Sequence, residues 1–209
     1  MACWHKHVLP ILSSLLLAVG VCAAPIKLAD ALDQLELLDS NHWKIGEVEG
    51  RRCLILETPG EQRPPVRRPS EFALYKSDTA IGEFTVEAAT RMPEAIKNRD
   101  ICLIFGYQDD THFYYAHISS NSDNMFHNII MRVDGDSRTR INLEVDPEPR
   151  LFNGWRSIKV QHLPNGDIRV FVDDPGKPVM TAKDTTYPVG KVGFGAFDDR
   201  AAFDTLSID

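Results

Sequence analysis

The chain is poor in cysteine and has no excess of basic residues. It contains 4 cysteines in 209 residues, and its 23 Lys and Arg are outnumbered by 30 Asp and Glu, for a net charge of −7. No basic patch or stripe stands out, so nucleic acid is not an expected partner. Cys53 and Cys102 lie in apolar, strand-like runs. This favours buried free thiols over a disulfide between them.

Beyond its N-terminus the chain also has no apolar run long enough to span a membrane. Residues 1–24 combine a weakly basic start, the apolar run Val8–Val21 and a small-residue end. These features predict a secretory signal peptide cleaved after Ala23 or Ala24, and hence export to the periplasm or the outside of the cell. Lipidation at Cys22 is the less favoured alternative, because the preceding residue is a valine where such signals need a small side chain.

No internal repeat, coiled coil or low-complexity tract is present. About 185 of the 209 residues follow the predicted signal peptide, which is the length of one domain with a sizeable core. Leucines and an alanine at spacings of three and four make Ile26–Leu38 the one plausible helix, although a linker ending in a short strand fits as well. We therefore expect an N-terminal extension or short helix at 25–41 and a single β domain at 42–209.

Short alternating segments separated by turn residues dominate the rest of the chain. Asn165-Gly166 between two apolar runs predicts a hairpin, Gly60–Pro69 reads as an irregular proline-rich loop, and Arg138–Val145 reads as one strand. About a dozen such segments predict an all-β fold, a two-sheet antiparallel β-sandwich or jelly roll. Trp155 and Phe194, each beside glycine, are expected in its core.

A second predicted hairpin, Asp100–Ser119, carries the least usual pattern. Because side chains alternate along a strand, Phe113, Tyr115 and His117 share one face, and the opposite face of the same strand has the character of core. A row of aromatic residues where a soluble sheet usually shows charge has two interpretations. The row is either covered by another layer or a loop, or it is a surface on which sugars stack.

The C-terminal third resembles a known family. The segments Gly154–Val160, Asn165–Asp173 and Gly190–Asp199, followed by Phe203-Asp204-Thr205, look like the C-terminal half of concanavalin A-like lectin and glucanase domains. The laminin-G-like and 3-keto-disaccharide hydrolase branches are the most similar, and the likeness in strand order extends over Trp43–Ile208. The resemblance implies a two-sheet jelly roll that binds or cleaves carbohydrate on its concave face, without choosing between the two.

Polar and aromatic residues of the central strands form the main candidate site: Tyr107, Phe113, Tyr115, His117, His127, Asn128 and Arg132. Stacking and hydrogen bonding to sugar hydroxyls is the favoured interpretation. Catalysis by Tyr115, His117 and His127, as in β-elimination on a uronic-acid polymer, is the second. Plain packing of the histidines is the third. No short-spacing metal motif accompanies them.

Glu144–Glu148 resembles the Glu-x-Asp-x-Glu signature of laminarinase-like glucanases, whose carboxylates must alternate on a regular strand. Pro147 interrupts the strand that this requires, so a solvated acidic loop is favoured.

Three carboxylates near the C-terminus, Asp198, Asp199 and Asp204, suit a calcium ion. The slightly favoured alternative is a turn at the first two residues and an ion pair of Asp204 with an arginine such as Arg200. No other cofactor is expected.

Together these patterns predict an exported, monomeric carbohydrate-recognition domain. A glycoside hydrolase or polysaccharide lyase of the same fold is the first alternative, and a laminin-G-like adhesion or structural module is the second.

Overall fold

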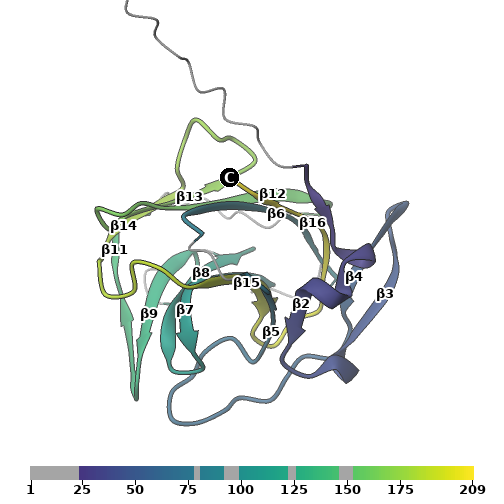
Figure 1. Ribbon diagram of the computed structural model, residues 1–209, viewed down its shortest axis with the longest axis horizontal. Coiled ribbons are helices and arrows are strands. Elements are labelled where there is room, and N and C mark those ends of the chain that lie inside the picture. Colours follow the sequence, from purple (N-terminus) through teal and green to yellow (C-terminus); the bar gives the residue numbers. More distant parts are fainter. Residues whose placement is uncertain (1–23, 78–80, 92–98, 122–125, 146–152) are drawn as a thin grey trace, which may run out of the picture.

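Two antiparallel sheets pack face to face in the computed structural model (Figure 1). The structure describes residues 24–77, 81–91, 99–121, 126–145 and 153–209. The predicted all-β sandwich is confirmed. Among the described residues, no helix is long and apolar enough to cross a membrane.

The larger sheet, sheet A, has nine strands. In spatial order they are β11 (Asn142–Val145), β14 (Met180–Lys183), β13 (Asp167–Val172), β12 (Arg156–His162), β6 (Glu83–Thr90), β16 (Ala201–Ile208), β4 (Arg51–Leu56) and β3 (Trp43–Val48), with β1 (Ile26–Lys27) also paired to β16. The predicted hairpin at Asn165-Gly166 joins β12 to β13, and Gly166 has the positive φ of 83° that such turns require.

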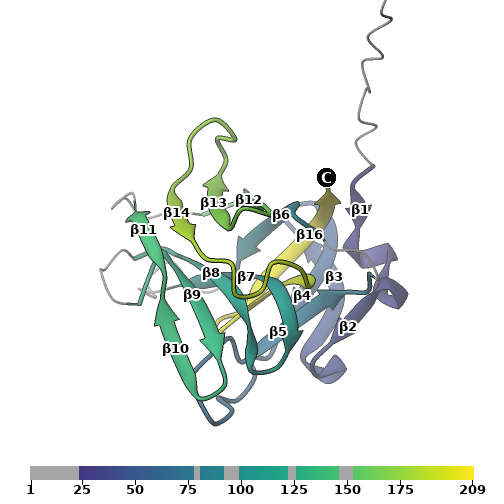
Figure 2. The same ribbon diagram turned by 60° about the vertical axis from the view of Figure 1, so that its left-hand side comes forward.

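The smaller sheet, sheet B, has seven strands. Their order is β10 (Ser137–Arg140), β9 (Ile129–Asp134), β8 (His112–Ser119), β7 (Asp100–Asp109), β15 (Lys191–Ala196), β5 (Glu71–Tyr75) and β2 (Leu35–Leu37). The predicted hairpin at Asp100–Ser119 is confirmed as β7 and β8, with Asp109 paired to His112 across the turn. Figure 2 shows β9 and β10 extending from one side of the sandwich.

The core fills the space between the sheets with alternate side chains from each. Val86 and Ile158 of sheet A are fully buried against Leu103, Tyr114 and other side chains of sheet B. The predicted interior side of β8 is confirmed, because Tyr114, Ala116 and Ile118 all belong to this core. Phe194 is also part of it, in T-shaped contact with Trp43.

The N-terminal segment forms no α-helix. It contains three short 3₁₀ turns, Leu28–Asp30, Leu32–Gln34 and Ser40–His42, while β1 joins sheet A and β2 joins sheet B. Strand pairing overrides the helical spacing here, and Leu32 and Leu38, which a helix would bury with the other leucines, are exposed. Residues 26–37 are thus built into both sheets.

Two further expectations need correction. The single strand expected at Arg138–Val145 is divided, since β10 lies in sheet B and β11 in sheet A, so the chain changes sheets at Ile141. Trp155 lies outside the main core. It is half-buried on sheet A, beside Cys53 and Ile55, with the Arg51 guanidinium 4.9 Å from its ring centroid.

Candidate functional site

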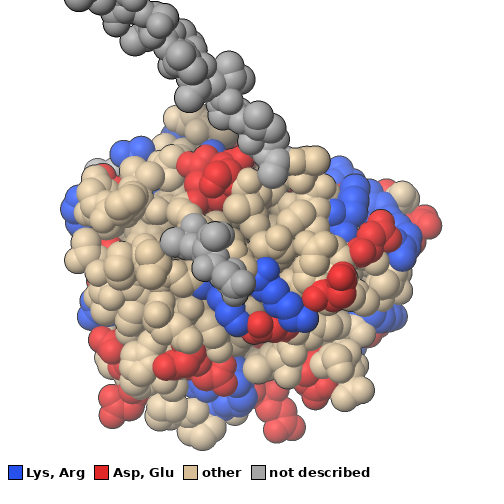
Figure 3. Space-filling view, viewed as in Figure 1, with Lys and Arg blue, Asp and Glu red and all other residues tan. Residues whose placement is uncertain are grey.

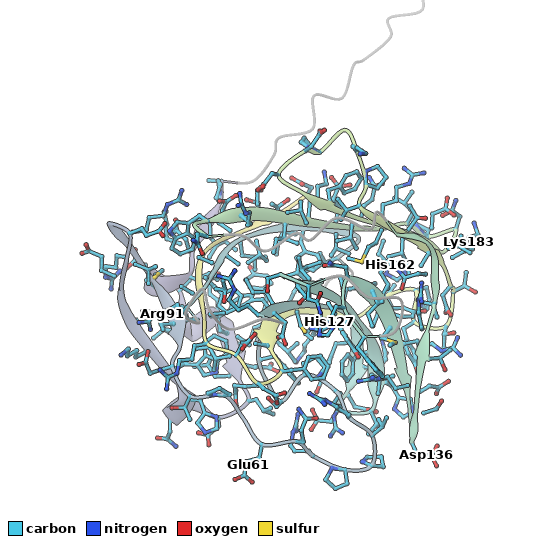
Figure 4. The ribbon with its side chains drawn as sticks, turned by 180° about the vertical axis from the view of Figure 1, so that it is seen from behind. Glu61, Arg91, His127, Asp136, His162 and Lys183 are labelled. Atoms are coloured by element: carbon cyan, nitrogen blue, oxygen red, sulfur yellow. The ribbon has the colours of Figure 1, made fainter. Side chains whose placement is uncertain are left out.

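The outer face of sheet B, which points away from sheet A, is covered at one end by a loop. Residues 57–70, here called the covering loop, connect β4 to β5 and run below sheet B in Figure 1; Figure 4 labels Glu61 on it. Val66 packs against the apolar side chains of this face. The guanidinium of Arg63 lies 5.8 Å from the ring centroid of Phe72 on β5.

A buried arginine holds the covering loop in shape. Arg68 is 4% exposed, and one terminal nitrogen of its guanidinium donates to the carbonyl oxygens of Arg63, Pro64 and Val66 at 2.9–3.1 Å. Burial lowers the pKa of this guanidinium from its usual high value, and the nearby Arg63 lowers it further. A loop without strand partners thereby acquires internal hydrogen bonds, which buried carbonyls require.

Beneath the covering loop, aromatic rings form a continuous row across the outer face. Phe113 lies 5.6 Å from Tyr107 and 6.3 Å from Tyr115 between ring centroids, and Tyr115 lies 5.6 Å from Phe197. The row ends where His117 contacts Phe197 at 5.2 Å and His127 at 5.5 Å. Phe113, Tyr115 and His117 are 0%, 1% and 5% exposed, so the covered-face interpretation is the right one for all three.

The other end of the row opens into a pocket of about 290 Å³. It combines aromatic, imidazole, carboxylate and guanidinium groups, contributed by Arg67, Asp100, Tyr115, His117, Phe126, His127, Arg138, Phe197, Asp198 and Asp199. Strands β7, β8, β10 and the segment after β15 therefore meet at this pocket. Figure 4 shows His127 near the middle of the molecule when it is seen from behind.

The charges of the pocket are arranged in two parts. At the rim, Arg67 donates to Asp198 at 2.7 Å, and its guanidinium lies 5.5 Å from the ring centroid of Phe197. Deeper, the buried Asp199 accepts the backbone N–H of Asp100. Burial, reinforced by the neighbouring Asp100, raises the pKa of Asp199 to about 7.

Three predicted site residues, Tyr115, His117 and His127, do come together in the pocket. His117 is 5% exposed, and its ring Nδ1 lies 2.5 Å from the carbonyl oxygen of Phe126. Tyr115 is almost fully buried, and burial raises the pKa of its phenol. A phenol in that state is not poised to act as the base of a lyase reaction.

The other predicted site residues lie elsewhere. Asn128 is a buried structural residue that accepts the N–H of Ser119 at 2.9 Å. Tyr107 donates to Asp110 at 2.9 Å beside the covering loop. Arg132 belongs to the other face of β9, where it donates to Asp184 at 2.6 Å.

The three carboxylates proposed for calcium do not form one group. Asp198 and Asp199 border the pocket, whereas Asp204 lies in sheet A and accepts from Lys27 at 2.8 Å and from Arg51 at 3.5 Å. Asp204 also lines a separate, open hollow between β1 and β4. The ion-pair alternative is therefore the correct one for Asp204, with Lys27 and Arg51 in place of Arg200.

The acidic motif at Glu144–Glu148 falls largely outside the described residues. Only the backbone of Glu144 and Val145 is described, as the end of β11.

Sequence reasoning missed four major contributors to the pocket: Asp100, Phe126, Arg138 and Phe197. For Asp100 a signal existed, because the register of the β7–β8 hairpin places Asp100 and Cys102 on the same face as His117. For the other three the hairpin gives no such signal. They reach the pocket from the segment before β9, from β10 and from the segment after β15, which are brought together only by long-range pairing.

Comparisons with known proteins support the assignment of the fold. No protein-family model matches the chain, and no curated protein does. Among solved structures, the carbohydrate-binding module CBM66 from Bacillus subtilis superposes with a TM-score of 0.60 at 17% identity, over 83% of this chain and 95% of that one.

Two glycoside hydrolases also match over part of their length. They are a xylan β-1,4-xylosidase from Bacillus halodurans (TM-score 0.56, 17% identity) and a Bacteroides ovatus xyloglucan GH43B protein (TM-score 0.54, 14% identity). The matches cover 85% and 84% of this chain, which spans 37% and 36% of the two enzymes. At these identities the likeness establishes a shared β-sandwich fold.

Proposed function

We propose that this protein is an exported carbohydrate-recognition domain that binds a glycan in the pocket at the open end of sheet B. The observation that carries the proposal is the lining of that pocket. The exposed ring of Phe126 lies beside guanidinium, imidazole and carboxylate groups, which is the combination that stacks on sugar rings and hydrogen-bonds their hydroxyls. The fold it shares with a carbohydrate-binding module supports the same assignment.

The shape of the pocket favours a short ligand. Its volume of about 290 Å³ is at the lower end of the range for ligand sites, and the covering loop packs on apolar side chains of the same face. A polysaccharide chain lying along the whole sheet would have to displace that loop. We therefore expect recognition of one or two sugar units, as a free oligosaccharide or as the end of a longer chain.

The surface agrees with a neutral or mixed ligand rather than a polyanion. In Figure 3, Lys and Arg side chains lie among Asp and Glu side chains over the visible face, and the chain as a whole carries a net charge of −7. A nucleic-acid partner would call for a continuous basic surface.

The test is a glycan panel followed by titration calorimetry on the best ligand. Arg138→Ala should weaken binding roughly 5- to 150-fold, the equivalent of about 1–3 kcal/mol for a lost charged hydrogen-bond donor. The matched control is Arg169→Ala, an exposed arginine on sheet A that donates to Gln161 at 3.2 Å. Equal affinity of both variants and wild type, or no ligand in the panel, would refute the proposal.

An enzymatic role in glycan cleavage is the second candidate, favoured by one observation. The pocket holds two buried carboxyl groups, Asp100 and Asp199, and the second has a pKa of about 7. A carboxyl group protonated near neutral pH is what a general acid for glycoside hydrolysis needs. Release of reducing ends from a bound glycan, abolished in Asp199→Asn, would establish this role; binding without turnover would exclude it.

A further inference from the structure

Three side chains of metal-binding types lie close together at the pocket, where Asp100 and His117 line it and Cys102 lies beside them. Asp100 and Cys102 are alternate residues of β7, and His117 of β8 is paired directly with Cys102. One donor atom from each residue, a carboxylate oxygen, the thiol sulfur and an imidazole nitrogen, lies within 4.8 Å of the other two. All three residues are buried. We propose that these residues form a binding site for a transition-metal ion, with zinc(II) as the metal of choice.

The imidazole is the strongest indication. Nδ1 of His117 is 2.5 Å from the carbonyl oxygen of Phe126, to which it can only donate, so the neutral ring presents the lone pair of Nε2 to the cluster. That Nε2 is buried and has no hydrogen-bond partner, although Oδ2 of Asp100 lies 3.4 Å away. A nitrogen lone pair facing a carboxylate oxygen is unfavourable unless a proton or a cation lies between them.

The remaining atoms of the ligands are held as in known metal sites. Oδ1 of Asp100 accepts the backbone N–H of Phe197 at 3.0 Å, which leaves Oδ2 turned towards His117. The bond from His117 to Phe126 likewise fixes the ring by the nitrogen that would not bind the metal. Metal-binding histidines and carboxylates are characteristically oriented by such outer hydrogen bonds.

The spacing suits a small tetrahedral ion. Zinc binds nitrogen and oxygen at about 2.0–2.2 Å and sulfur at about 2.3 Å, so two donors on one tetrahedral zinc are about 3.3–3.8 Å apart. The oxygen and nitrogen are already 3.4 Å apart, and the sulfur needs only a small approach from its present place within 4.8 Å. Calcium, which takes six to eight oxygen ligands, does not fit a set with sulfur and nitrogen.

The ordinary alternative is an ion pair between a protonated His117 and Asp100. An ion pair accounts for the short approach of nitrogen and oxygen, but it gives no role to the thiol of Cys102, which directly faces the histidine across the strands. The other described cysteine, Cys53, lies on sheet A and has no such neighbours among the described residues. A zinc ion would use all three groups, displacing the thiol proton to solvent.

With three protein ligands, zinc retains a fourth position. Asp100 and His117 line the pocket, so that position faces the space in which we place the glycan. Water, a sugar hydroxyl or His127 could complete the tetrahedron. The metal site itself rests on the protein side chains alone and does not depend on the proposed sugar ligand.

The test uses the purified protein freed of metal by a chelator and then titrated with zinc chloride alone. We expect one zinc per chain by native mass spectrometry, at least tenfold weaker binding in Cys102→Ala and His117→Gln, and no change in Cys53→Ala, the matched control. Calcium chloride should give no saturable binding. Cobalt(II) in place of zinc should give thiolate-to-cobalt charge-transfer absorption in the wild type and none in Cys102→Ala.

Equal zinc affinity in wild type and Cys102→Ala would overturn the proposal, as would the absence of stoichiometric binding. Circular dichroism of each variant shows whether it is folded. If His117→Gln fails to fold, Cys102→Ala decides the question, because replacing a buried thiol by a methyl group is a small change in volume. Glycan binding measured with and without zinc then separates this outcome from that of the proposed function.

Discussion

The two ends of the outer face of sheet B are built from the same strands but have different properties. At the sealed end, Phe72 and Phe113 lie under the covering loop and behave as a second hydrophobic core. At the open end, Tyr115 and His117 continue the same aromatic row but meet carboxylates and guanidinium groups at a pocket. One strand, β8, thus packs in an apolar cluster at its start and borders the pocket at its end.

The largest expected effect tests the sealed end. Phe113→Ala should lower the free energy of unfolding by about 3–5 kcal/mol, because it removes a fully buried ring from a packed cluster. Chemical denaturation measures this loss. Phe126→Ala is the control from the open end, since that ring is 50% exposed at the pocket, and should change stability by no more than about 0.5 kcal/mol. Similar losses in the two variants would contradict the distinction drawn here.

A smaller effect should follow from loosening the covering loop. Arg68→Met keeps much of the side-chain length but removes the donor to three carbonyl oxygens, at an expected cost of about 1–3 kcal/mol. Faster amide hydrogen exchange should appear in the covering loop and not in the β12–β13 hairpin. Unchanged exchange in the loop would mean that Arg68 does not hold it in place.

The smallest effect compares a histidine of the sandwich interior, His162, with a partly exposed one at the β7–β8 turn, His112. His162 packs against Phe105 and Tyr114 at 5.6 and 5.5 Å, and burial lowers its pKa. The unfolded chain therefore takes up a proton more readily than the folded one. The stability that depends on neutral His162 is complete above its ordinary pKa of about 6.5 and is lost as pH falls through the lowered value.

Melting temperatures between pH 7.5 and pH 5 provide the measurement. The wild type should lose more stability over this range than His162→Gln, which has no group to protonate at that position. His112→Gln serves as the control, because His112 is a partly exposed histidine at the β7–β8 turn. A pH dependence that is the same with and without His162 would show that its burial does not govern acid stability.

Local patterns in the sequence determined most of the sandwich. Alternation and turn chemistry predicted the β7–β8 and β12–β13 hairpins, because a two-residue period and an Asn-Gly turn act between near neighbours. They also predicted correctly which side chains share each face of β8. Tyr115 and His117 lie together on the outer face, where the pocket is found. The signal peptide and the export of the protein remain predictions from the sequence.

Long-range contacts determined the features of the structure that local sequence patterns did not predict. The spacing of Ile26–Leu38 is helical, yet pairing with β16 and β5 turned its ends into strands. The covering loop has no period that would reveal which end of sheet B it shields, and its position depends on contacts of Val66 and Arg63 with β5 and the outer face. Asp204 was separated from Asp198 because the chain passes from one sheet to the other between them. Such contacts join residues far apart in the chain, so their outcome depends on the packing of the whole sandwich and not on any local run of residues.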